Sequence, residues 1–301
     1  MEPSPKKRLT AVGAVCHTTV YRVETIPAPP AKILAADACR VVDGMAISAA
    51  CAFHRLGGEA RIWARLGDDA AGAAQRAELA ATGVDVSDFR MVAGGRSSHA
   101  TVVVDARGDR LVVPFHDPSL DRSPDWLPLD RLGQSDFLHV EVRWAEGAEV
   151  ALAAARRIGL PAMLDGETAP PGVLERLVPL ASHAVFSDQG ILAYARATDV
   201  ETALRRVAAT HDGHVGASCG ADGYAWIENG AVRRVPAPTV DVVDTLSAGD
   251  VFHGALALML AEGRPTEAAA RFACVAASIK CTRFGGRLGC PTREEVIAAG
   301  G

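Results

Sequence analysis

The residues best suited to catalysis lie in one short stretch, DTLSAGDVFHGALALML, which begins at Asp244. The small side chains of residues 247–249 leave their backbone N–H groups open to a ligand, and the apolar run that follows has helical spacing. N–H groups at the start of a helix bind phosphate, because the helix dipole adds to their positive charge. Asp250 falls in the first turn, where the dipole favours the ionised carboxylate.

This arrangement predicts phosphoryl transfer. The amides of Ser247, Ala248 and Gly249 hold the charge of the moving phosphoryl group, while Asp250 accepts the proton of an attacking hydroxyl. The alternative is an ordinary Asp cap on a core helix. A second acid at Asp244, next to a run of small residues, weighs against that alternative.

Strands that alternate with helices must position this stretch. LTAVGAV at 9–15 is typical of a strand buried on both faces. Beyond residue 136 we predict strands at 137–142, 160–166, 183–188 and 213–218, helices at 146–158, 172–180 and 199–210, and two long Ala-rich helices within 248–282. This rhythm implies βαβ units, so we expect an α/β fold with a Rossmann-like, mostly parallel sheet flanked by helices.

A different pattern near the front of the chain predicts a small second sheet. Residues 20–26 alternate as a half-exposed strand does, and two β-branched runs flank the turn 107–109, which indicates a hairpin. We find no internal repeat and no low-complexity linker. We therefore expect one domain over 1–301, with a small β lid formed by about 18–42 and 89–116.

Polar side chains follow the predicted parallel strands, where open α/β sheets place their sites. The candidates are Glu141, Arg143, Asp165, Glu167, Ser187, Asp188 and Ser218. Acids at strand ends also cap the helices that follow, so each residue taken singly is more typical of a structural role.

Composition limits the class of protein. The chain has 301 residues, of which 49% are hydrophobic and 22% charged, as is ordinary for a globular protein. Its net charge of -5 offers no general attraction to nucleic acid or anionic membranes, and no apolar run approaches the ~20 residues that span a membrane. Seven scattered cysteines without a CxxC pair indicate reduced thiols and a cytoplasmic location.

DTLSAGDVFHGAL resembles the signature DTxGAGDxFxGA of the ribokinase/PfkB carbohydrate kinases. The resemblance extends over nearly the whole chain, through blocks at 66–72, 81–89 and 220–230. It implies a ribokinase-like core, a β lid over a sugar substrate, ATP with Mg²⁺, and often a monovalent cation such as K⁺. Members of this family often form homodimers through the lid, so we expect a homodimer here.

The resemblance also assigns roles to residues of the signature. Asp250 becomes the catalytic base and residues 247–249 the anion hole. Ser247 stands where Gly is commonest in the family, a departure of little expected consequence because the hole uses amides. Asp244 and the Leu246 carbonyl, with Cys281, are implied to line the cation site.

On the nucleotide side, the family's TxGxxG turn corresponds to Ser218, Gly220 and Gly223, and we also assign Ser187 and Cys274 to this side. The family's frequent NxxE motif appears as SDQG at 187–190, so the usual magnesium-associated Glu is missing. Asp165 is our first candidate for Mg²⁺, and Glu167 and Asp188 stay open as alternatives.

Within the family the chain is most similar to the sulfofructose kinases. The residues that carry this resemblance include EVRW at 141–144, LDG at 164–166, GDVFHGALA at 249–257 and KCTRFGGR at 280–287. A sulfonate requires fixed cations, and the resemblance points to Arg143, beside Glu141, and to Lys32 on the lid.

The hydroxyl-reading residues of the family are changed. Thr18 stands where the family has Asp, Asp43-Gly44 replaces the usual Gly-Gly pair, and Ser48 replaces a common Asn. Pro114 stands on the lid where the sulfofructose group has Asn. We hypothesise that Asp43 restores the lost carboxylate from the opposite side.

The main hypothesis is an ATP-dependent kinase that phosphorylates a primary hydroxyl of a ketose-like sugar such as 6-deoxy-6-sulfofructose. A fructokinase-like, ketohexokinase-like or deoxy-keto-acid kinase is the alternative within the same chemistry. A non-catalytic nucleotide- or sugar-sensing protein of the same fold is the alternative from another class. A Rossmann oxidoreductase is disfavoured, because no GxGxxG follows the first strand.

Overall fold

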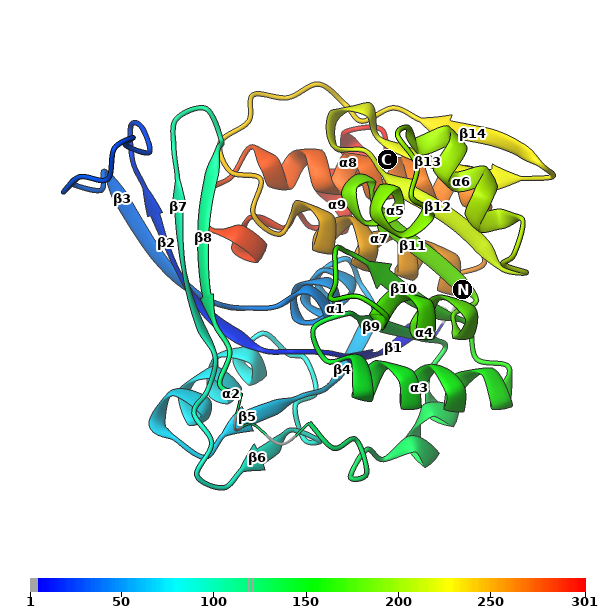
Figure 1. Cartoon of the computed structure of the whole chain (residues 1–301), viewed down its shortest axis with the longest axis horizontal. Coiled ribbons are helices and arrows are strands. Elements are labelled where there is room, and N and C mark those ends of the chain that lie inside the picture. Colours follow the sequence, from blue (N-terminus) through cyan, green and yellow to red (C-terminus); the bar gives the residue numbers. More distant parts are fainter. Residues whose placement is uncertain (1–4, 119, 121) are drawn as a thin grey trace.

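Six parallel strands form most of the main sheet. The computed structural model, which describes residues 5–118, 120 and 122–301, orders this sheet β14-β13-β12-β11-β10-β9-β1-β4 (Figure 1). The parallel strands are β1 (Arg8–Val12), β4 (Glu59–Trp63), β9 (Phe137–Glu141), β10 (Ala162–Gly166), β11 (His183–Ser187) and β12 (His214–Ser218), and β13 (Tyr224–Glu228) and β14 (Ala231–Val235) continue the sheet antiparallel. The predicted Rossmann-like sheet is confirmed.

Helices cover both faces of this sheet. One core cluster joins the sheet to α1 (Met45–Arg55), α7 (Ala248–Ala261) and α8 (Thr266–Cys281). The other joins it to α3 (Ala145–Ile158), α4 (Val173–Leu177) and α6 (Val200–Ala208). Alternation along the strands sorts the residues, since Phe137 belongs to the first cluster and its neighbour Leu138 to the second.

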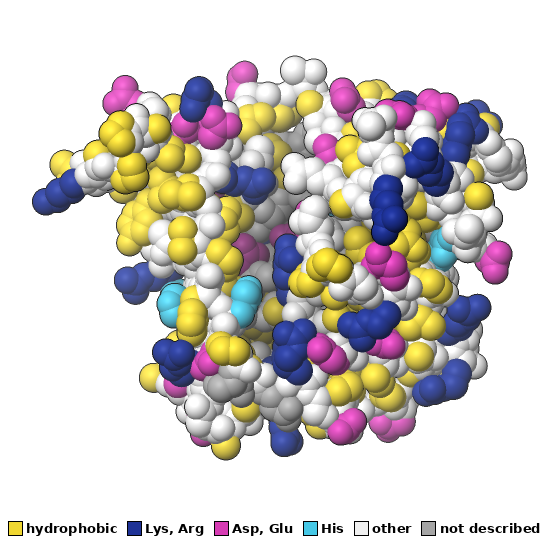
Figure 2. Space-filling model, viewed as in Figure 1, with side chains coloured by type: hydrophobic (Ala, Val, Ile, Leu, Met, Phe, Trp, Pro, Cys, Tyr) yellow, Lys and Arg dark blue, Asp and Glu magenta, His cyan; other side chains and the backbone are white. Residues whose placement is uncertain are grey.

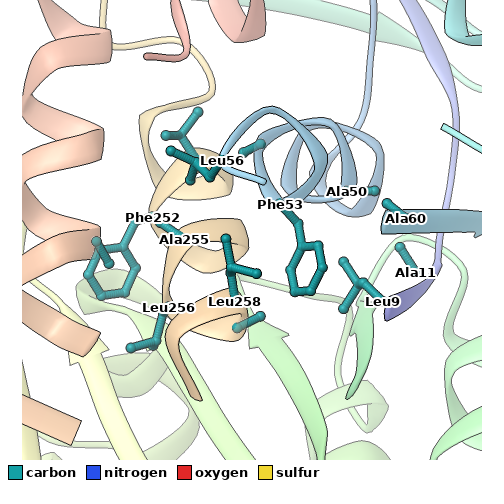
Figure 3. Packing of buried hydrophobic residues seen from close by; sticks show 14 of the residues in the cluster. Leu9, Ala11, Ala50, Phe53, Leu56, Ala60, Phe252, Ala255, Leu256 and Leu258 are labelled. Carbon is teal, nitrogen blue, oxygen red and sulfur yellow. The ribbon is translucent and has the colours of Figure 1, made fainter. Parts of the chain in front are cut away.

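Helices α1 and α7 lie against each other on the part of the main sheet formed by β9, β1 and β4. Figure 3 shows Phe53 of α1 beside Leu258 of α7 and Leu9 of β1. The two helices approach closely at Gly254, where an added Cβ atom meets the Ala49 carbonyl oxygen at 2.3 Å. This packing fixes the N-terminus of α7, which carries the predicted catalytic stretch.

A separate four-stranded sheet forms the lid, in the order β3-β2-β7-β8 (Figure 1). Its strands are β2 (Cys16–Arg22), β3 (Asp37–Asp43), β7 (His99–Val104) and β8 (Arg110–Phe115). The predicted hairpin around residues 107–109 is confirmed, because β7 and β8 pair antiparallel on either side of it. The predicted boundaries, one domain over 1–301 with a lid formed by about 18–42 and 89–116, stay a prediction.

The remaining elements adjust the predicted pattern. A small parallel pair, β5 (Arg65–Gly67) and β6 (Arg90–Val92), flanks α2 (Ala70–Ala81). The predicted helix 172–180 ends as α4 and continues as a 3-10 turn, Val178–Leu180, because Pro179 has no N–H to donate. Helices α5 (Asp188–Ala195) and α9 (Arg293–Ala298) complete the fold. Among the described residues, no helix is long and apolar enough to cross a membrane.

One buried polar residue stands out in the central strand β9. His139 is fully buried, and neither of its ring nitrogens has a hydrogen-bond partner among the described residues. Its ring meets that of His253 edge-on, with the centroids 5.8 Å apart. Burial lowers the pKa of His139 to about 3, so the ring is neutral in the folded protein.

Replacing His139 with Leu should raise the thermal stability of the protein. An unsatisfied buried polar group costs about 1–3 kcal/mol, and each kcal/mol shifts Tm by about 2–4 °C in a chain of this size. The gain should be larger at about pH 5 than at pH 7, because the unfolded chain protonates the histidine below about 6.5 and the folded protein does not. Melting curves at the two pH values measure both effects, and a lower Tm for the variant at both would contradict the prediction.

Candidate active site

A cavity of about 910 Å³ lies between the lid and the carboxyl ends of the parallel strands. Figure 2 shows this hollow, with acidic and basic side chains in its depth. Most of the predicted site residues line it: Thr18, Asp43, Gly44, Arg143, Asp165, Ser187, Ser218, Gly220, Gly223, Leu246, Ser247, Ala248, Gly249, Asp250, Cys274 and Cys281. The structure therefore brings together residues from both ends of the chain.

Four predicted residues do not line the cavity. Lys32 is exposed on the loop before β3, outside the cavity. Ser48, Glu141 and Asp244 are fully buried behind the cavity wall. These three act on the site only through the residues that they hold.

Helix α7 begins at the floor of the cavity as predicted. Asp250 lies in its first turn, and Ser247 precedes it as the N-cap residue. The backbone of Ser247 is left-handed, with φ 60° and ψ 13°. Glycine adopts this conformation without strain, whereas a residue with a Cβ atom loses about 1–2 kcal/mol. The replacement of Gly by Ser at 247 was expected from the sequence to matter little, because the anion hole uses backbone amides. The left-handed backbone adds a second requirement that favours Gly at this position.

The amides of the predicted anion hole are partly engaged within the turn itself. The N–H of Ala248 donates to the carbonyl oxygen of Thr245 at 3.2 Å, and the N–H of Val251 donates to the carbonyl oxygen of Ser247 at 3.0 Å. A phosphate at this helix start meets the dipole of the whole of α7. To bind the Ala248 amide, the phosphate must replace the hydrogen bond to Thr245, which is weak because 3.2 Å is close to the upper length limit for N–H donors.

The hydroxyl of Ser247 binds Asp43, the last residue of lid strand β3. Ser247 Oγ donates to both carboxylate oxygens of Asp43, at 3.2 and 3.1 Å, and Ser48 Oγ of α1 also donates to Oδ1. Gly44 follows with φ 136°, and an added Cβ atom there lies 2.2 Å from the Ala14 carbonyl oxygen. Ser48 was predicted to contact the substrate, but its hydroxyl holds Asp43 instead.

Glu141 also supports the site from behind. It accepts hydrogen bonds from the backbone N–H of Ala14, at 2.8 Å, and of Arg143. Burial raises the pKa of Glu141 to about 7, against the opposing effect of these two N–H donors. Its contacts tie the end of β9 to the turn after β1, so the direct substrate contact predicted for Glu141 is not seen.

The carboxylate of Asp250 sits among other acids. Burial, followed by the charges of Asp43 and Asp165, raises the pKa of Asp250 well above its usual value. The predicted effect of the helix dipole, which favours the ionised form, is therefore outweighed in the ligand-free protein. A raised pKa suits a general base, because a base is most effective when its pKa approaches the working pH.

Asp165 fits a role beside a divalent cation. Its carboxylate is buried next to Asp250, and burial raises the pKa of Asp165. His253 Nδ1 lies 3.5 Å from Asp165 Oδ2, and the same nitrogen contacts the Gly249 carbonyl oxygen at 2.8 Å. No group of three or more His, Cys, Asp or Glu side chains within the described ranges forms a metal cage. Mg²⁺ is commonly held by one or two carboxylates together with phosphates and water, so this donor set is sufficient.

The residues implied for a monovalent cation do not fit one. The carboxylate of Asp244 already accepts hydrogen bonds from three backbone N–H groups, those of Leu246, Gly285 and Gly286. It also pairs with the buried ammonium group of Lys280. Cys281 contributes its carbonyl oxygen to the N–H groups of residues 243 and 244, at 2.8 and 3.1 Å. Of the predicted ligands, the Asp244 carboxylate and the Cys281 carbonyl are therefore engaged by protein donors, and the Lys280 ammonium supplies the positive charge at Asp244, so we derive no step through a monovalent cation.

An arginine and a histidine that line the cavity were missed from the sequence. Arg110 begins β8, donates to the Thr245 carbonyl oxygen at 3.3 Å, and opposes the rise in the pKa of Asp250. His116 follows the same strand and also lines the cavity. Strand alternation was the available signal, because Arg110, Val112 and Pro114 share one face of β8 and all line the cavity.

This fold and site define a sugar-phosphorylating kinase, with a lidded cavity and an acid at the start of a helix beneath it. Residues 6–293 match the sequence model of the pfkB family carbohydrate kinases, and the chain belongs to that family. It is a carbohydrate kinase.

Relatives of known structure and sequence agree with this assignment. The chain is 26% identical to the ribokinase of Bacillus subtilis, over 96% of this chain and 98% of that protein. It is 30% identical to the fructokinase of Klebsiella pneumoniae, over 75% and 80% of the two chains. A crystal structure from Agrobacterium tumefaciens, of a protein provisionally called a ribokinase, is 39% identical with a TM-score of 0.95, over 98% of this chain and 97% of that one.

Substitutions of Ser247 should separate its strain from its hydrogen bonds. Ser247→Gly and Ser247→Ala both remove the hydroxyl that holds Asp43, but only Ala retains a Cβ atom in the left-handed region. We expect the Ala variant to be less stable than the Gly variant by about 1 kcal/mol. Urea unfolding of the pair measures the difference, and equal stabilities would show that position 247 carries no backbone strain.

Proposed function

We propose that this kinase phosphorylates a primary hydroxyl of a ketose-like sugar that carries an anionic group, such as 6-deoxy-6-sulfofructose. The observation that supports an anionic acceptor is the position of Arg143. Arg143 lines the main cavity and also a side pocket of about 60 Å³ that shares Ala14 and His116 with the cavity. Arg65 lines the same side pocket.

The geometry of Arg143 suits the recognition of an oxyanion. Its Nη1 donates to the Thr168 carbonyl oxygen at 3.0 Å, which orients the guanidinium. A guanidinium has five N–H donors in a planar fork, so several stay available to a ligand. Desolvation, followed by the charges of Arg143 and Arg65, lowers the pKa of His116, which supports a positive potential at this end of the cavity.

In the proposed reaction the acceptor lies between the lid and α7. The register of the lid places Thr18, Ala100 and Pro114 in one row across β2, β7 and β8, and all three line the cavity. Asp250 accepts the proton of the attacking hydroxyl, and the helix start at residues 247–249 holds the transferred group. Mg²⁺, with Asp165 as its protein ligand, supplies charge neutralisation when bound.

The nucleotide occupies the other end of the cavity in this proposal. Ser218 ends β12, and Gly220 and Gly223 have the positive φ angles of 54° and 85° that the turn requires. Ser187 caps α5 and donates to Glu167 Oε1 at 3.1 Å, which supports Glu167 as a second acid at the proposed nucleotide end. Cys274 lines the same end from α8.

Three further predictions from the sequence are part of this proposal. Lys32 contributes to the anionic subsite only if the exposed loop that carries it closes over the cavity. A homodimer formed through the lid is supported by the exposed apolar side chains of Leu111 and Val113 on β8. Figure 2 shows hydrophobic side chains gathered over the lid. A cytoplasmic location is the third.

A different candidate function is favoured by the altered hydroxyl-reading residues. Thr18 and Pro114 stand at the acceptor end of the cavity, where a sensing protein has no need of catalysis. A fructokinase-like enzyme for a neutral ketose and a kinase for a deoxy-keto acid would both use Asp250 as the base, and only the keto acid carries an anionic group that Arg143 could bind. Steady release of ADP with any sugar of a broad panel would exclude the sensor.

Asp250→Asn should lower kcat by about 10²–10⁴-fold, because the variant loses the proton acceptor. Its affinity for ADP should stay that of the parent protein, since the first turn of α7 is otherwise unchanged. A coupled assay of ADP release and a calorimetric titration with ADP measure the two quantities. Asp109→Asn, on the exposed lid turn, is the matched control. A fully active Asp250→Asn enzyme would refute the assignment of the base.

Arg143→Gln should raise KM for sulfofructose by about 10–100-fold while KM for fructose stays constant, because only the anionic acceptor loses a charged hydrogen bond. The measurement is ADP release with sulfofructose, fructose, other ketoses and deoxy-keto acids. Arg156→Gln, an exposed arginine on α3, is the control. Preference for a neutral ketose, with no response to Arg143→Gln, would refute the anionic acceptor and leave the kinase intact.

A further inference from the structure

Lys280 lies where the family resemblance implies a monovalent cation. It stands in the last turn of α8, and its side chain and that of Asp244 are both fully buried. The Lys280 Nζ donates to the Asp244 carbonyl oxygen at 2.6 Å and lies 3.2 Å from Asp244 Oδ2. The protein thus places its own unit positive charge against the Asp244 carboxylate, which the resemblance implies as a ligand of the ion.

Protein donors surround the carboxylate of Asp244, and Oδ2, the oxygen that pairs with Lys280, has no acceptor position left for a second cation. Leu246 N–H donates to Oδ1 at 2.8 Å, and the N–H groups of Gly285 and Gly286 donate to Oδ2 at 3.0 and 2.9 Å. With Lys280 these make four donors, and a carboxylate offers about four acceptor sites. Gly285 and Gly286 have φ angles of 106° and 58°, so the backbone conformation that brings both amides to Asp244 favours glycine.

The pair acts on the segment that leads into the anion hole. Asp244 is followed directly by residues 245–247, and the Lys280 bond to the Asp244 carbonyl oxygen fixes the start of that segment. Arg110 of the lid binds the next carbonyl, that of Thr245. The path to the N-terminus of α7 is therefore held by cationic side chains on successive peptide groups.

We propose that Lys280 is a positioning residue that replaces the monovalent cation, so that this kinase folds and binds nucleotide independently of K⁺. A buried ammonium without a partner is unfavourable, and here the Asp244 carboxylate and carbonyl supply the partner. Burial lowers the pKa of Lys280, and the charge of Asp244 opposes that shift.

Melting curves and Mg·ADP titrations in KCl and in tetramethylammonium chloride of equal ionic strength test this proposal, and they require no acceptor sugar. The wild-type protein should have the same Tm and the same affinity for ADP in both salts. Lys280→Ala should lower Tm by on the order of 10 °C in tetramethylammonium chloride, because it leaves a buried carboxylate unpaired. KCl should restore part of this loss in proportion to the logarithm of its concentration, as binding to the vacated space stabilises the folded state.

Two further variants identify the cause. Lys280→Met removes the charge but fills the space, so it should lose stability without recovery in KCl. Lys7→Ala, which breaks a partly exposed ion pair with Asp136, should behave as the wild type in both salts. A wild-type Tm or ADP affinity that rises specifically with K⁺ would overturn the proposal, even if the Lys280 variants fail to fold. A folded Lys280→Ala protein that ignores K⁺ would also overturn it.

Discussion

The site depends on the contact between Asp43 and Ser247, which joins residues 204 positions apart in the sequence. Asp43 ends lid strand β3, Ser48 lies on α1, and Ser247 caps α7, so one buried carboxylate connects three elements. A buried carboxylate is stable only with hydrogen-bond donors, and these two hydroxyls are such donors. The position of Asp250, three residues after Ser247, follows from this junction and from the packing of α7 on α1.

The distribution of charge explains why the cavity suits phosphoryl transfer. Asp43, Asp165 and Asp250 share its floor, and their mutual repulsion contributes to the raised pKa of Asp250. The cations Arg110 and Arg143 line the cavity with exposed side chains, and their charges offset only part of the rise in the pKa values of Asp250 and Asp165. The repulsion among these carboxylates would fall, and the ionised form of Asp250 would be favoured, if Asp165 held a divalent cation at the floor. The acid cluster and a metal-dependent substrate are thus complementary.

Local patterns in the sequence predicted the elements that carry strong periodicity. The parallel strands after residue 136, the lid hairpin and the helix start at α7 all follow from alternation, β-branched runs and small residues. Strand β3 was not recognised, because its residues 37–40 are mostly exposed and polar and only its last three are buried. Helix α5 was missed because only two of its eight residues are buried, so its apolar face is narrow.

Contacts between distant segments were the part that the sequence could not predict. The burial of Ser48 and Glu141 behind the cavity depends on how α1 and β9 pack, not on local pattern. The left-handed conformation of Ser247 and the pairing of Lys280 with Asp244 likewise appear only in three dimensions.

The two departures from the family pattern at 43 and 247 are physically linked. Each position commonly holds Gly in the family, and each holds a polar residue here. A carboxylate at 43 with Gly at 247 would keep only the Ser48 hydroxyl as a side-chain donor, and a side chain at 247 alone would add left-handed strain without a compensating bond. Together the hydroxyl satisfies the carboxylate, and the hydrogen bonds offset the strain. The pair is therefore best understood as one substitution in two parts, which places a negative charge beside the acceptor end of the cavity while preserving the start of α7.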